Sequence, residues 1–185
     1  MPDPNLFLGK ALLGLGALGI AAGVLALLVP ERLRAGLQAF PRSKAPGWIL
    51  GAIGAFWVCW VISHAALGRF EVVKPFIPVL GVVAYAAIVF FLDELLAPRM
   101  LGGVLLLVAN PLLNGVRWAD SPWRYAVILI AYAWVIAGCA LMLHPWTFRQ
   151  LNEKFAGSAG AVRRIGWGKI LGGAVLLAAG LWHLR

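Results

Sequence analysis

Long apolar runs alternate with short polar segments along the whole chain, and this pattern predicts six membrane-spanning helices. Each run falls within or close to the roughly 17 to 25 residues that a helix needs to cross the hydrocarbon core of a bilayer. The predicted spans are residues 11–29, 47–68, 76–92, 100–116, 125–143 and 166–184. We therefore expect an all-α, polytopic integral membrane protein whose six helices form three hairpins in a single transmembrane domain, residues 1–185.

The composition agrees with this class of protein. Of the 185 residues, 62% are hydrophobic and the mean hydropathy is +0.89, more than a water-soluble domain of this size can bury. The formal net charge of +9 comes from cations that cluster in the loops between the apolar runs. We expect membrane lipids as partners, with anionic lipid at the basic loops. We expect no nucleic acid, because the sequence contains no basic and aromatic recognition module.

Small residues form packing faces on two of the predicted spans. Such faces let another helix approach the backbone closely. The first span carries Gly16, Gly19 and Gly23 on one face, and the second carries Gly47, Gly51 and Gly54. The second span also has a separate face with Trp57, Trp60 and His64. Two different neighbours are therefore expected for the second span.

A hairpin unit occurs twice in the chain: an apolar helix, a proline, a short basic amphipathic segment, a Gly-Trp pair and a second apolar helix. Apolar residues follow Pro30 and Pro145 with helical spacing, as expected for a helix that lies in the membrane interface. These residues are Leu33, Leu37 and Phe40 in the first copy and Phe148, Leu151 and Phe155 in the second. Two interpretations stay open: an internal repeat of hairpins 11–68 and 125–184, or a similarity that arises because loops between membrane helices share a composition.

The distribution of Lys and Arg predicts the orientation. The loops after the first, third and fifth spans carry nine of these cations, whereas the opposite side carries five, with Lys10 near the boundary. Because cytoplasmic loops carry an excess of Lys and Arg, we expect loops 30–46, 93–99 and 146–165 in the cytoplasm and both termini outside. The membrane that we expect is a bacterial cytoplasmic membrane.

The fourth span contains the most polar group near the middle of the predicted membrane. Asn110 and Asn114 lie one turn apart, Arg117 continues their face at the end of the span, and Pro111 frees the carbonyl group of Leu107. Polar groups at this depth need partners in protein or water. The group is either a site for a ligand, ion or water, or a kink whose amides bond to neighbouring helices.

Histidines at the ends of two spans suggest a second candidate site. His64 lies near the outer end of the second span and His183 ends the sixth span on the same side, so the two are expected to be able to meet. Two histidines at one membrane face can hold haem, and a single histidine can hold a chlorin, with Trp57 and Trp60 beside it. The alternative is that these histidines bond to backbone or headgroups. No cofactor is predicted outright, and a tetrapyrrole at His64 is the alternative.

The sequence contains no GxSxG, HExxH or P-loop pattern and no GxGxxG that opens a helix after a strand, and its seven acidic residues lie outside the centres of the apolar runs. We therefore expect no enzyme and no metal site. The expected function is that of a non-catalytic membrane subunit, or an assembly or scaffold protein, in a larger membrane complex with other membrane subunits. One alternative is a channel or facilitator for a small solute or lipid that uses Asn110, Asn114 and Arg117. A second alternative is a haem- or chlorin-binding membrane subunit.

The predicted orientation has a direct test at Ser158, which lies in the third basic loop. In a variant with Ser158→Cys and both native cysteines replaced by serine, we expect a membrane-impermeant thiol reagent to react only from the cytoplasmic side. Reaction from the outer side alone would reverse the assignment.

Overall fold

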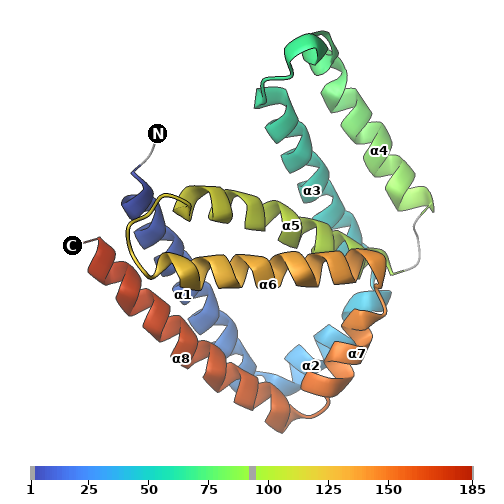
Figure 1. Cartoon of the computed structure of the whole chain (residues 1–185). Coiled ribbons are helices and arrows are strands. Elements are labelled where there is room, and N and C mark those ends of the chain that lie inside the picture. The colour runs from blue at the N-terminus through green and yellow to red at the C-terminus, as the bar shows by residue number, and fades with distance from the viewer. Residues whose placement is uncertain (1–2, 92–94, 185) are drawn as a thin grey trace. The chain divides into compact units, whose positions relative to one another are not determined.

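The computed structural model of the chain describes residues 3–91 and 95–184. The regular structure of these residues is helical throughout, with no strand among them, which confirms the all-α class (Figure 1). Six helical segments are long and apolar enough to cross a membrane, as predicted for a multi-pass membrane protein. They are α1 (Pro4–Leu28), α3 (Lys44–His64), the continuous segment Gly68–Phe91, α5 (Leu96–Val116), α6 (Arg124–Leu143) and α8 (Ala159–His183). Of the predicted loop 93–99, residues 93 and 94 lie outside the described residues.

Among the spanning segments that begin earlier than the hydrophobic pattern predicts, α1 and α8 do so because a capping residue precedes each of them. The Asp3 carboxylate accepts a hydrogen bond from the Asn5 amide at 2.9 Å, and α1 starts at Pro4, a favourable first position. The Ser158 hydroxyl accepts a bond from the Ala161 amide at 3.1 Å, and α8 starts at Ala159. Two arginines of the predicted third basic loop, Arg163 and Arg164, therefore lie within α8.

Both amphipathic segments of the proposed repeat are helices, as predicted. They are α2 (Pro30–Ala39) and α7 (Thr147–Phe155), and a short 3₁₀ turn, η1 (Phe40–Arg42), follows the first. A longer 3₁₀ segment, η2 (Gly68–Phe76), leads directly into α4 (Ile77–Phe91). The internal duplication and the arrangement as three hairpins stay predictions.

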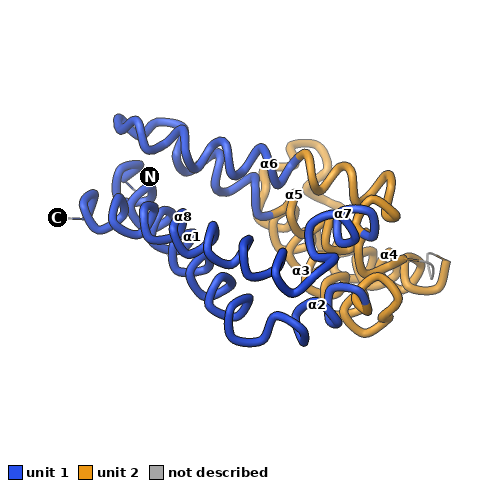
Figure 2. The backbone as a smooth tube through the Cα atoms, turned by 90° about the horizontal axis from the view of Figure 1, so that it is seen from below, with its two compact units in different colours: residues 1–38, 108–135, 149–185 blue, residues 39–107, 136–148 orange. Residues whose placement is uncertain are grey.

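The chain divides into two compact units, which are coloured separately in Figure 2. Unit 1 comprises Met1–Gln38, Val108–Val135 and Arg149–Arg185, and unit 2 comprises Ala39–Leu107 and Ile136–Phe148. The prediction of a single transmembrane domain stays a prediction, and each unit is described by itself below.

Unit 1 is built on a close antiparallel contact between α1 and α8 (Figures 1 and 2). The contact follows glycines that recur every seven residues on both helices: Gly9, Gly16 and Gly23 on α1, and Gly166, Gly173 and Gly180 on α8. A Cβ atom added at Gly16 would lie 2.7 Å from the carbonyl oxygen of Gly173, and one added at Gly173 would lie 2.7 Å from that of Gly16. The glycine face predicted on the first span therefore receives α8 as its neighbour.

Two small clusters complete unit 1. Leu8 and Leu12 of α1 are fully buried against Val116 and Val127, which belong to α5 and α6. At the other end, Leu33 and Leu37 of α2 pack against a second cluster, consisting of Ala26, Ala156 and Val162. The side-chain amide of Asn152 donates a 2.8 Å hydrogen bond to the Leu37 carbonyl group and so ties α7 to α2. Part of the apolar stripe predicted to face lipid thus packs on protein.

Unit 2 uses the second predicted glycine face. Gly47 contacts Leu96 and Ala97 at the start of α5, and Gly51 contacts Tyr85 of α4. Close backbone approach also joins α5 to α6, because a Cβ atom at Gly102 would lie 2.7 Å from the carbonyl oxygen of Gly138. The rings of Phe40 and Phe148, from the two halves of the proposed repeat, lie 5.1 Å apart.

Adjacent glycines on α8 provide a matched test of the α1–α8 contact. Gly173→Ala places a methyl group against the backbone of α1, and we expect it to lower the free energy of unfolding by about 1 to 3 kcal/mol. Gly172→Ala meets no atom within 4 Å and is expected to leave stability unchanged or to raise it, because alanine is the better helix former. Thermal unfolding in detergent, followed by circular dichroism, measures both variants. Equal stability of the two variants would contradict the packing described here.

Candidate functional site

A hollow of about 550 Å³ lies between α3 and α4, two helices that run side by side within unit 2 (Figure 1). We call it the α3–α4 groove. Its volume is within the range of small-molecule sites, about 300 to 1,000 Å³. Its walls are mainly apolar, and the lining residues are Ala52, Ala55, Phe56, Cys59, Trp60, Ser63, His64, Pro78, Gly81, Val82 and Tyr85.

Small residues on both helices create the groove. Ala52 and Ala55 leave space along α3, and Gly81 allows α4 to approach the Cys59 sulfur, since a Cβ atom at Gly81 would overlap that sulfur. Hydrogen bonds to backbone carbonyl groups hold two of the lining side chains. The Tyr85 hydroxyl donates to the Trp48 carbonyl at 2.9 Å, and the Cys59 thiol donates to that of Ile77 at 3.7 Å.

Charged side chains brace the turn that joins α3 to α4. Lys74 forms an ion pair with Glu71 at 2.6 Å, and the Glu71 carboxylate also accepts a hydrogen bond from the Leu67 amide at 3.0 Å. Gly68 has a φ of +55°, a left-handed conformation that favours glycine over other residues. The turn is therefore held by local interactions next to the end of the groove where His64 lies.

Among the lining residues, His64 carries a ring nitrogen that can bind a ligand. Its Nδ1 atom lies 2.8 Å from the Trp60 carbonyl oxygen. Because a carbonyl oxygen only accepts hydrogen bonds, this contact places a proton on Nδ1, and in the neutral form of the ring Nε2 is then unprotonated. The imidazole also stacks on the Trp60 indole, with ring centroids 4.3 Å apart. Nε2 can therefore coordinate a metal ion or accept a hydrogen bond.

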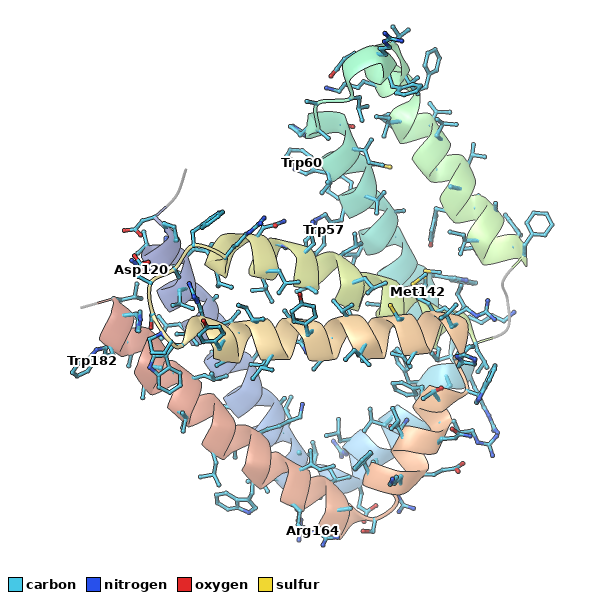
Figure 3. All side chains as sticks on the ribbon, viewed as in Figure 1. Trp57, Trp60, Asp120, Met142, Arg164 and Trp182 are labelled. Carbon is cyan, nitrogen blue, oxygen red and sulfur yellow. The ribbon has the colours of Figure 1, made fainter. Side chains whose placement is uncertain are left out.

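The structure places the other predicted cofactor residues around α3 and in unit 1. Trp57 and Trp60 project from α3 (Figure 3), and both line a second, shallower hollow of about 350 Å³ with Ile53 and Phe56. His183 belongs to unit 1, where its Nδ1 atom lies 3.1 Å from the Ala179 carbonyl oxygen. His64 belongs to unit 2, so the predicted meeting of the two histidines stays a prediction.

The predicted polar site on the fourth span lies on α5 in unit 1. The Asn114 side chain donates a 2.9 Å hydrogen bond to the Asn110 side-chain oxygen, and both residues are exposed. Arg117 follows the end of α5, and its guanidinium group lies 5.2 Å from the centre of the Trp118 ring. The structure thus joins the two asparagines to each other, whereas the guanidinium group of Arg117 lies over an aromatic ring.

Comparisons of the chain with known protein families, curated proteins and solved structures found no match. Within residues 3–91 and 95–184, no group of three or more His, Cys, Asp or Glu side chains is placed to hold a metal ion.

The sequence predicts His64 as a site residue but does not predict the groove beside it. Ser63, Cys59 and Tyr85 were not predicted as site residues, although all three line the groove. One signal is available in the sequence: Ala52 and Ala55 lie at i and i+3, beside the predicted glycine face of the same helix. That spacing indicates a face with empty space, but it does not say which helix forms the opposite wall.

Proposed function

We propose that the chain is a non-catalytic subunit, or an assembly or scaffold protein, of a larger complex in a bacterial cytoplasmic membrane. The proposal rests on the exposed pair of amides, Asn110 and Asn114, on a helix that is long and apolar enough to span a membrane. Exposed apolar side chains need no protein partner there, because lipid chains cover them without loss. Amide groups do need one, since hydrocarbon offers them no hydrogen bonds.

The hydrogen bond between the two asparagines satisfies only part of their capacity. Each amide has two N–H donors and one oxygen acceptor. After this hydrogen bond, Asn110 keeps both donors, and Asn114 keeps one donor and its oxygen. By helix rise, Asn110 lies about 9 Å from the end of α5, within the hydrocarbon of a centred span. Polar side chains on another membrane helix would satisfy these groups, as is common between packed helices.

The orientation forms part of the proposal. With loops 30–46 and 146–165 in the cytoplasm, exposed arginines of α2, α7 and the start of α8 would meet the anionic inner leaflet. They include Arg32, Arg149, Arg163 and Arg164. The short paired helices α2 and α7 would then lie at one membrane surface, leaving the faces of the longer helices for other subunits.

Native mass spectrometry of the protein, extracted from its own membranes in mild detergent, tests the proposal. We expect a second integral membrane polypeptide in stoichiometric amount. In the variant Asn110→Leu/Asn114→Leu, we expect at least about a 10-fold loss of that polypeptide, because each hydrogen bond between membrane helices contributes about 0.6 to 2 kcal/mol.

The matched control is Leu129→Ala, which changes an exposed apolar residue of α6 in the same unit. It should retain the partner, and helix content by circular dichroism should be the same in both variants. Isolation of the chain only as a symmetric homo-oligomer would overturn the proposal and favour the facilitator built on Asn110, Asn114 and Arg117. If the double variant retained the partner fully, the two amides would not be the groups that bind it.

A further inference from the structure

We propose that the α3–α4 groove binds a membrane-soluble molecule with an apolar body and a hydroxyl head group, such as a quinol. The hydroxyl group donates a hydrogen bond to His64 Nε2, and the body lies along the groove toward Ala52. This ligand site goes beyond the subunit function and does not depend on it.

The head group is set by the hydrogen-bonding state of His64. The Trp60 carbonyl group holds the ring proton on Nδ1, so neutral His64 offers its ligand a lone pair and no donor. A hydroxyl group complements this lone pair, whereas a quinone carbonyl or an ester oxygen does not, because both only accept. Ser63 lines the same end of the groove, and because its hydroxyl both donates and accepts, it can bond to either head group, so His64 alone distinguishes them.

The shape of the body follows from where the groove lies relative to His64. On α3, the lining residues run from Ala52 to His64, about 18 Å by helix rise, and all of them precede His64 in the chain. The groove therefore extends from the imidazole in one direction only. An elongated molecule bonded at its head fits such a groove along its length.

A tetrapyrrole fits this geometry less well. A macrocycle coordinated at its central metal extends on all sides of the axial nitrogen, so much of the ring would lie beyond the lined part of the groove. On the other side of His64, the chain enters the turn braced by Glu71 and Lys74. An amphiphile would place its head beside these charges and its body among apolar residues.

The test uses the full chain in lipid nanodiscs, labelled with ¹⁵N-histidine, and a decyl-chain benzoquinol kept reduced with ascorbate. The chain contains three histidines. We expect the quinol to shift the Nε2 resonance of His64 and to bind about 3- to 10-fold more tightly than the matching quinone, the difference that one hydrogen bond supplies. His183 is the internal control, because it makes the same bond to a carbonyl group four residues earlier and does not line the groove.

Two variants separate the head from the body. His64→Phe keeps an aromatic ring beside Trp60 and removes the lone pair, so the preference for quinol over quinone should disappear. Ala55→Leu fills the groove and should abolish the His64 shift, whereas Ala174→Leu, at an exposed position of α8, should not. Unchanged helix content by circular dichroism in each variant shows that the fold is retained, because His183 lies in unit 1 and does not report on unit 2.

Three results would overturn the proposal. In the first, the quinone shifts His64 as strongly as the quinol does. In the second, the quinol shift persists in Ala55→Leu with unchanged helix content. In the third, added haem gives a visible absorption band that is lost in His64→Phe, which would assign the nitrogen to a tetrapyrrole instead.

Discussion

Backbone contact between α1 and α8 through glycines is the constraint on which unit 1 depends. In lipid, apolar side chains gain nothing by leaving their solvent, so two helices associate through close packing and polar contacts. Glycine allows the closest packing, and the seven-residue repeat keeps Gly9, Gly16 and Gly23 on the line that faces α8. Once this pair is fixed, its two ends receive the smaller contacts: the buried residues near Leu8 at one end, and α2 with α7 at the other. A methyl group at the centre would therefore affect both ends.

Unit 2 shows what happens where small residues do not meet another backbone. Neighbouring helices fill the space beside Gly51 and Gly102, and the packing there is close. Ala52 and Ala55 face the α3–α4 groove instead, where α4 approaches through Gly81 but does not fill the space. The same class of residue thus produces either a tight contact or a cavity, depending on what the opposite helix presents. Hydrogen bonds from Tyr85 and Cys59 to backbone carbonyl groups fix two lining side chains, so the groove is part of the folded structure of unit 2.

This dependence explains which features the sequence could predict. Bilayer thickness sets the length of a spanning helix, so the six spans follow from hydropathy alone. The ends of the helices do not, since Asp3 and Ser158 extend α1 and α8 into polar sequence through hydrogen bonds that hydropathy ignores. The glycine face of α1 predicts a neighbouring helix but does not identify it. Any helix with small residues could pack there, and α8 lies far from α1 in the chain. The sequence predicts His64 as a candidate site residue. It does not predict the groove, because one wall of the groove is formed by α4, whose position the sequence alone does not give.

Polar side chains in the spanning helices satisfy part of their hydrogen-bonding capacity within their own helix. The donors and acceptors that remain determine which partner each side chain can bind. Asn114 bonds to Asn110 four residues earlier, and His64 bonds to the Trp60 carbonyl group at the same spacing. The asparagines keep donors and an acceptor, which suits another amide or a hydroxyl side chain on a neighbouring helix. His64 keeps a lone pair alone, which suits a donor or a metal ion. Because the local partner decides which atoms stay available, the helical spacing that reduces the energetic cost of these groups in lipid would also give the proposed sites their specificity.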